Sequence, residues 1–169
     1  MPSDPAVIHG VLCDTSYFIR WAKPGDALHP AAHAYLKYLV DGGHTLYVST
    51  IALAEYAVRD AIANLPLRYF RVVPFNVDHA QRAGEFARAV FEARGTLPTP
   101  IDQRAIIPND TKMFAQADVT PEITHYLTAD RDCERIYRLL KAGAQPRFQF
   151  VHLSTPWHQA FGQLDLSEP

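Results

Sequence analysis

The sequence predicts an α/β fold of three layers, in which a central parallel sheet is covered by helices on both faces, as in Rossmann-like folds. Short apolar runs alternate with longer segments whose apolar residues recur at helical spacing, from about residue 7 to 153. Runs without polar alternation suit strands that are buried on both faces. No repeat, low-complexity tract or linker interrupts this order, so residues 1–169 are expected to form one domain with a short polar C-terminal tail.

The first expected strand is the apolar run Val7–Cys13. It stops at Asp14-Thr15-Ser16, three residue types that favour helix caps and turns. A helix is expected to begin at Tyr17 and to end near Lys23-Pro24-Gly25, because Pro and Gly do not continue a helix. The chain therefore begins with a strand that leads directly into an acidic turn and a helix.

The middle of the chain repeats the pattern. A helix is expected over Pro30–Val40, with Pro in the first turn and Gly42-Gly43 just past the end. The strand Leu46–Val48 and the helix Ile51–Asn64 follow, and Pro66 ends that helix. Each helix in this region lies between two short strands, which is the βαβ order of a parallel sheet.

The remaining elements keep the same alternation. The strand Arg71–Phe75 precedes a strongly periodic helix over Asp78–Arg94. A loop with Gly95, Pro98 and Pro100 spans Gly95–Ile107, and we expect it to form a rim that contacts substrate. The last expected elements are the helix Pro108–Asp118, the strand Thr124–Thr128, the helix Asp130–Lys141 and the strand Phe148–Leu153.

Acidic residues occur where such a fold places its site, at the carboxyl ends of the strands. Asp14 follows the first strand, and Asp130 and Asp132 follow the fourth. Glu55 lies one turn into the helix after the second strand, and Asp110 lies in the first turn of a later helix. Any one aspartate alone is also a normal helix cap. Their joint placement predicts one acidic cluster.

Close carboxylates repel one another, and this repulsion favours binding of a divalent cation with oxygen ligands such as Mg²⁺. Glu55 supports a functional reading because it lies within the apolar stretch Ile51–Ala57, where a charged residue needs a partner, a metal or a route to water. A cation at this position would activate water and stabilise a phosphoryl group under attack. The cluster therefore predicts a bound divalent cation.

Four short motifs resemble the PIN-domain nucleases, which include the VapC toxins of bacterial toxin–antitoxin pairs. In chain order the motifs are Leu12–Ser16, Ser49–Glu55, Asn109-Asp110 with Ala115 and Ala117, and Leu127–Asp132. The resemblance extends over about residues 7–153. The chain is longer than a typical VapC toxin, chiefly in the Gly95–Ile107 region, and Cys133 replaces a usual aromatic residue.

The resemblance implies an endoribonuclease that uses Mg²⁺ or Mn²⁺. It assigns metal ligation to Asp14, Asp110 and Asp130, with Asp132 as an alternative to Asp130, and it lets Glu55 bind the metal directly or through water. Ser16 and Thr128 would support the acidic cluster. An antitoxin is a possible partner. RNA target and sequence preference stay open, and DNA is an alternative substrate because the cluster acts on the phosphodiester.

The charge balance restricts how RNA can be bound. With 18 acidic and 16 basic residues, the chain as a whole is not a basic nucleic-acid binder, so contacts must come from a local patch. The candidates nearest to the predicted site in sequence are Arg20, Lys23, Arg59, Lys112 and Arg131. Each of them is equally consistent with a solvated surface charge.

The alternative to an enzyme is a catalytically silent PIN-like module that acts by binding RNA or protein. A phosphatase of the haloacid dehalogenase type is disfavoured because Ser16 stands where its second Asp is needed. We expect a cytoplasmic protein without a membrane segment, and a homodimer. Trp21, Tyr35 and Tyr38 would lie either in a dimer or antitoxin surface or in the core.

Overall fold

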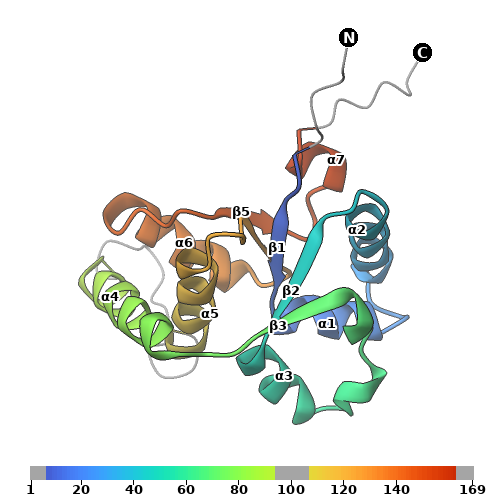
Figure 1. The fold of residues 1–169 in the computed structure, drawn as a ribbon, viewed down its shortest axis with the longest axis horizontal. Helices are drawn as coiled ribbons and strands as arrows, with labels where there is room; N and C mark the ends of the chain where they lie inside the picture. The colour runs from blue at the N-terminus through green and yellow to red at the C-terminus, as the bar shows by residue number, and fades with distance from the viewer. Residues whose placement is uncertain (1–6, 94–106, 163–169) are drawn as a thin grey trace.

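Five parallel strands form the centre of the molecule, in the order β3-β2-β1-β4-β5 (Figure 1). The computed structural model describes residues 7–93 and 107–162. The strands are β1 (Gly10–Cys13), β2 (Thr45–Ser49), β3 (Phe70–Val73), β4 (His125–Thr128) and β5 (Gln149–His152). Every strand pair is parallel, as the alternation of strands and helices predicts.

Helices cover both faces of this sheet and complete three layers. Figure 1 shows α1 and α2 on one side of the sheet and α4, α5 and α6 on the other. No helix within residues 7–93 and 107–162 has both the length and the apolar character needed to cross a membrane. The helices are α1 (Thr15–Ala22), α2 (His29–Asp41), α3 (Thr50–Ala57), α4 (Val77–Ala93), α5 (Ile107–Val119), α6 (Arg131–Gly143) and α7 (Trp157–Ala160), with 3-10 turns at Ile62–Asn64 and Leu67–Tyr69.

The strand order places a topological switch at the centre of the sheet. From β1 the chain moves outward to β2 and β3, and it then returns to the other side of β1 for β4 and β5. Connections therefore leave β1 and β4 in opposite directions, and a crevice forms at their carboxyl ends. Asp14 follows β1 and Asp130 is two residues past β4, so the switch point brings them together although 116 residues separate them in sequence.

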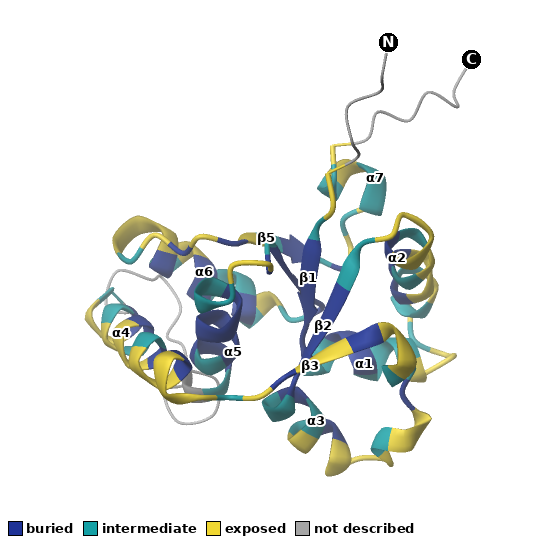
Figure 2. Cartoon of the chain, viewed as in Figure 1, coloured by how far each residue is buried: buried dark blue, intermediate teal, exposed yellow. Residues whose placement is uncertain are grey.

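The core lies on both faces of the two central strands. All residues of β1 and β4 are buried, and Figure 2 shows exposed residues on the outer sides of the helices, such as α2 and α4, and in the segment between α3 and β3. Large aromatic side chains fill the space between sheet and helices, among them Tyr17, Phe86, Phe114, Tyr126 and Phe148. Burial on both faces explains why these strands read as nearly continuous apolar runs.

Three element boundaries differ from the sequence prediction by more than two residues. The strand Val7–Cys13 is shorter, since Val7 is 71% exposed and pairing starts at Gly10. The helix Ile51–Asn64 is also too long, because α3 ends at Ala57. Just beyond it, the Asp60 carboxylate accepts the backbone N–H of Ala61 at 2.7 Å, a local hydrogen bond that competes with helix formation.

The third difference concerns the segment after Leu153, which was predicted to be a polar tail. Instead, α7 returns to the molecule, and Trp157 stacks on Tyr38 of α2 with ring centroids 4.2 Å apart. Phe161 also packs against the core. The predicted loop Gly95–Ile107 lies outside the described residues apart from Ile107, which begins α5.

Candidate active site

A cavity of about 220 Å³ opens at the carboxyl ends of β1 and β4. It contains four of the five carboxylates that the sequence singles out, all except Asp132, and they come from four different places in the chain. Its lining residues are Asp14, Thr15, Ser16, Ile19, Glu55, Asn109, Asp110, Met113 and Asp130. The predicted acidic cluster therefore exists as a concave site at the topological switch point.

Asp14 is the most firmly held of the four. It is buried and caps α1: its Oδ1 accepts the Tyr17 backbone N–H at 3.0 Å and the Ser16 hydroxyl at 2.7 Å. Its Oδ2 accepts the Thr128 hydroxyl at 2.5 Å. Burial nevertheless raises the pKa of Asp14 to about 6, against the lowering effect of these hydrogen bonds. Hydrogen bonds therefore hold the Asp14 carboxylate in place, but they only partly offset the cost of burying its negative charge.

Ser16 and Thr128 connect the two central strand ends. The Ser16 and Thr128 hydroxyl oxygens are 3.1 Å apart, and the Ser16 hydroxyl also accepts the Ala129 backbone N–H at 2.8 Å. The Thr128 hydroxyl accepts the backbone N–H of Asp130 at 3.0 Å. Both hydroxyls therefore hold the turn after β4 against Asp14.

Asp110 is the least satisfied group in the site. It lies in the first turn of α5 and is 9% exposed. Its Oδ2 is buried and has no hydrogen-bond partner within the described residues. Burial raises the pKa of Asp110 to about 8, and the nearby carboxylates of Asp14, Asp130 and Glu55 add to the rise. Asp110 lines the cavity, and its buried oxygen without a partner in the described chain favours a positive ligand nearby.

Glu55 is oriented by two neighbours from different elements. Its Oε2 accepts the hydroxyl of Thr15, and its Oε1 accepts the side-chain amide of Asn109 at 2.5 Å. These contacts explain how a carboxylate is accommodated in the apolar stretch around it. Thr15 and Asn109 were not given roles in the sequence analysis; their positions directly beside Asp14 and Asp110 were the available signal.

The structure distinguishes Asp130 from Asp132. Asp130 lines the cavity and caps α6, with its Oδ1 accepting the Asp132 backbone N–H at 2.8 Å. Asp132 does not line the cavity, and its carboxylate pairs instead with Arg135 at 3.1 Å. The alternative metal-ligand role of Asp132 is therefore not supported by its position, because a residue at the second position of the helix faces another side.

The donor set fits a hard cation in composition. Carboxylate and amide oxygens are the ligands that Mg²⁺ and Mn²⁺ take from proteins, and Asp110 offers one without a partner. Within residues 7–93 and 107–162, no three His, Cys, Asp or Glu side chains already surround a common metal position. Metal binding would thus have to draw these side chains inward.

Comparisons with known proteins address the fold. No protein-family model and no curated protein matches the chain. Among solved structures, VapBC2 from Rickettsia felis bound to a DNA fragment from their promoter is 16% identical, with a TM-score of 0.59 over 85% of this chain and 98% of the other. DNA-bound VapBC from Salmonella typhimurium is 18% identical, with a TM-score of 0.54 over 87% and 99%.

A third similar structure is VapC20 from Mycobacterium tuberculosis, described as a sarcin-ricin loop cleaving toxin. It is 21% identical, with a TM-score of 0.52 over 74% of this chain and 93% of the other. The chain has a PIN-like fold. Identities this low establish the fold alone, since one fold can carry many functions. The predicted three-layer α/β/α architecture is confirmed.

The basic residues divide into two groups on this PIN-like fold. Arg20 and Arg131 line a second cavity beside the acidic one. Lys23 is exposed just after α1, and Lys112 lies on α5; neither lines the acidic cavity or its neighbour. Arg59 is exposed beyond the end of α3. Only Arg20 and Arg131 are therefore placed beside the carboxylates.

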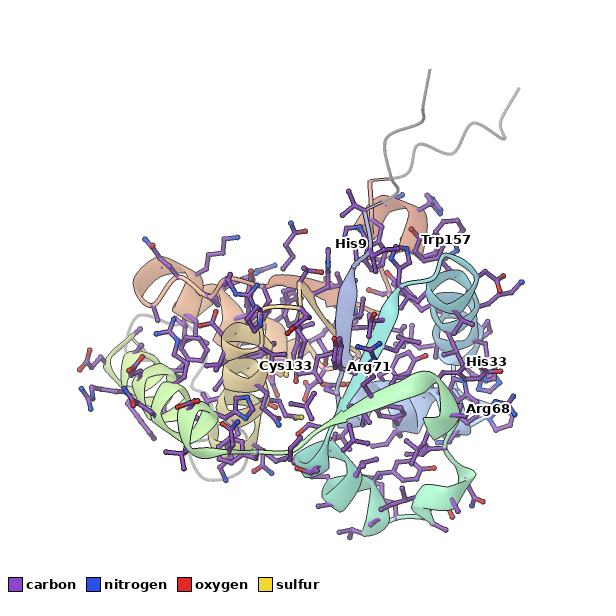
Figure 3. All side chains as sticks on the ribbon, viewed as in Figure 1. His9, His33, Arg68, Arg71, Cys133 and Trp157 are labelled. Atoms are coloured by element: carbon purple, nitrogen blue, oxygen red, sulfur yellow. The ribbon has the colours of Figure 1, made fainter. Side chains whose placement is uncertain are left out.

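The remaining side chains close to the acidic site are neutral. Cys133 is buried in α6, near the middle of the view in Figure 3, with its Sγ 4.0 Å from Asp14 Oδ2. Burial and the neighbouring Asp110 raise the pKa of the Cys133 thiol well above its ordinary value, so the sulfur is a protonated donor. Among the aromatic residues with two possible roles, Tyr35 is core, and Tyr38 and Trp21 are partly buried.

Proposed function

We propose that this PIN-like protein is a Mg²⁺- or Mn²⁺-dependent endoribonuclease. One observation carries the proposal: Asp110, whose buried Oδ2 has no hydrogen-bond partner among the described residues, lines a cavity together with Asp14, Glu55 and Asp130. Burial raises the pKa values of Asp14 and Asp110, and neighbouring carboxylates add to the rise, so a cation in the cavity would favour their charged forms. The ribonuclease part of the proposal is supported by the likeness to VapC20, a toxin described as cleaving the sarcin-ricin loop.

Each residue of the acidic cavity has a distinct role in the proposed reaction. Asp14, Asp110 and Asp130 would hold the cation, and Glu55 would reach it directly or through water. A bound divalent cation supplies positive charge that offsets the phosphodiester and makes water a better nucleophile. Ser16 and Thr128 keep Asp14 and the turn at Asp130 in position through the hydrogen bonds described above.

Glu55 is suited to receive the proton of the attacking water, because Thr15 and Asn109 hold both of its oxygens at the cavity wall. The water oxygen forms a bond to phosphorus while one phosphorus–oxygen bond to a ribose breaks, and the departing oxygen is protonated by solvent. No Ser, Cys or His nucleophile takes part in this scheme. The buried Cys13 and Cys133 thiols, whose pKa values are raised, are consistent with that.

The deciding experiment is cleavage of a mixed single-stranded RNA by the purified protein with Mn²⁺, beside an Asp14→Asn variant of matched folding. Cleavage that requires the metal and disappears in the variant is the expected result. Calorimetric titration with Mn²⁺ is the second readout. Absence of both cleavage and metal binding across several RNAs would replace this proposal with the silent binding module.

We further propose that the protein acts as a toxin with a cognate antitoxin, and that it forms a homodimer. The similarity to two VapBC assemblies supports the antitoxin partner. Expression in a bacterial host should slow growth with the wild-type chain and leave it unchanged with Asp14→Asn. Light scattering of the purified chain tests the dimer, and a monomeric mass over the accessible concentration range would exclude it.

A further inference from the structure

A second cavity, of about 570 Å³, lies directly beside the acidic one. The two cavities share Ser16 and Asp130 in their walls, so a ligand that occupies one can extend into the other. The wall of this second cavity differs in composition from that of the acidic cavity, because several elements contribute hydrogen-bond donors and cationic side chains to it. These come from α1, from the start of α6 and from the end of β5, as Arg20, Arg131, His152 and Ser154.

His152 presents a donor that nothing in the fold uses. Its Nδ1 accepts the backbone N–H of Ser154 at 3.1 Å and is 2.7 Å from the Ser154 hydroxyl. An imidazole nitrogen that accepts a backbone N–H carries a lone pair, so the proton of the neutral ring lies on Nε2. Nε2 is buried and has no hydrogen-bond partner within the described residues. A buried donor left unpaired is costly, and a ligand acceptor would remove the cost.

Arg20 shows the same feature on the opposite wall. Its Nη1 pairs with the Asp26 carboxylate at 2.5 Å, which fixes the guanidinium on α1. Its Nε is buried and, like His152 Nε2, is without a hydrogen-bond partner in the part of the chain that the structure describes. Arg131 is exposed at the first position of α6 and adds a flexible cation. Arg20, Arg131 and His152 thus line one cavity, and two of them carry a buried donor without a partner among the described residues.

The second cavity also has an acidic residue in its wall, Asp130. It caps α6 through Asp132 N–H, where the positive end of the helix dipole offsets part of its charge. The Asp26 carboxylate is already paired with Arg20. The donors therefore outnumber the free acceptors on this wall, which is the composition of an anion site.

We propose that this second cavity binds a phosphate of the RNA strand next to the one being cleaved, with His152, Arg20 and Arg131 as its donors. The proposal rests on the proposed ribonuclease function for the identity of the strand. A phosphate group has several acceptor oxygens and can satisfy His152 Nε2 and Arg20 Nε together after small side-chain movements. The subsite would hold the substrate so that the scissile phosphodiester lies over the acidic cavity.

The test is binding of a short, fluorescently labelled single-stranded RNA to the full chain in EDTA, measured over a series of salt concentrations. His152→Asn keeps an acceptor near the position of Nδ1 for Ser154 and removes the donor at Nε2. His152→Gln places an amide near Nε2 instead. Arg131→Ala removes the flexible cation, and Arg88→Ala on α4 is the matched control, because Arg88 is equally exposed and lines neither cavity.

We expect His152→Asn and Arg131→Ala to weaken RNA binding by about tenfold each, the usual loss for a hydrogen bond to a charged group. Arg131→Ala should also reduce the slope of log affinity against log salt by about 1. His152→Gln and Arg88→Ala should bind nearly as the wild type does. Thermal melting of each variant checks that the fold is retained.

Wild-type affinity in His152→Asn would overturn the proposal, as would an equal loss in Arg88→Ala or no RNA binding by the wild type. The assay contains no divalent metal and involves no cleavage, so it is independent of the ribonuclease proposal. If the variants lose binding while the wild type never cleaves RNA, the subsite stands and the nuclease fails. If cleavage occurs and the variants bind normally, the reverse holds.

Discussion

Buried titratable side chains lie at both ends of the sheet, but their surroundings differ. At the carboxyl end, Asp14 and Asp110 line an open cavity, and burial raises their pKa values to about 6 and about 8. At the amino end, His125 lies beside His9 and Phe161, with both ring-centroid distances 4.8 Å. Burial, with His9 and His44 adding to it, lowers the pKa of His125 to about 4.

Burial favours the neutral forms of the groups at both ends. The histidines at the amino end are covered by neighbouring side chains, whereas the carboxyl end has an oxygen without a partner among the described residues. Neighbouring side chains fill the space around the three imidazole rings. His44 Nδ1 accepts the His9 backbone N–H at 3.0 Å, and Phe161 packs on all three histidines. Figure 3 places His9 and Trp157 at this end of the molecule. At the carboxyl end an Asp110 oxygen has no partner in the described chain. Open space combined with a buried carboxylate oxygen that lacks a partner distinguishes a site from a packed cluster.

The largest expected effect comes from replacing Asp110 with its neutral amide analogue. Asp110→Asn should reduce cleavage by about a thousandfold or more, as loss of a central catalytic group does. The same change should raise the free energy of unfolding by about 1–3 kcal/mol, because burial raises the pKa of Asp110 and folding must either protonate the carboxylate or bury its charge, whereas the amide carries neither cost. Asp14→Asn should lose activity without this gain, since its carboxylate accepts several hydrogen bonds. Calorimetry and RNA cleavage measure both; reduced stability in Asp110→Asn would contradict the comparison.

The next effect is stabilisation by metal. At a Mn²⁺ concentration of about one hundred times its Kd, the wild type should gain about 2.7 kcal/mol of stability, while Asp110→Asn should gain much less. Thermal melting with and without the ion is the measurement, with Ca²⁺-free buffer and EDTA as the baseline. Equal shifts in melting temperature for the wild type and Asp110→Asn would show that the ion binds away from Asp110.

A smaller effect is expected at the packed end. Phe161→Ala should lower the free energy of unfolding by about 1–2 kcal/mol, less than a fully buried Phe, because the ring is only partly buried. Cleavage should be unchanged when measured on the folded protein. Val58→Ala is the control, since Val58 is 87% exposed and its loss should cost almost nothing. Denaturant unfolding of both variants decides whether the aromatic cluster belongs to the core.

The smallest effect is a pH dependence from His125. Its folded-state pKa lies below the unfolded value, so the unfolded chain binds more protons between about pH 6.5 and 4 and stability falls as the pH falls through this range. The contribution should be about 1 kcal/mol between pH 7 and 5 after allowance for solvent screening. It is measured as the difference between wild type and His125→Gln. His33→Gln on exposed α2 should match the wild type; if it matches His125→Gln instead, the effect is not local.

The sequence predicted most elements because the signals are local. The strands at β1 and β4 were recognisable from their apolar runs, and Asp14 and Asp130 from their positions just beyond them. The end of α3 was missed, since it depends on the Asp60 side chain replacing helical hydrogen bonds. The α7 turn was missed because a segment that reads as polar is recruited by two aromatic rings, Trp157 and Phe161.

By itself the sequence therefore determined the order of the layers and which carboxylates follow which strands, because backbone preference and burial act over a few neighbouring residues. Only the tertiary structure decided that Asp130 rather than Asp132 faces the cavity, and that Asp110 is left with an unpaired oxygen. It also brought Arg20 beside His152, on α1 and β5. The proximity of residues that are far apart in sequence depends on strand order and helix rotation, and packing across the whole core determines both.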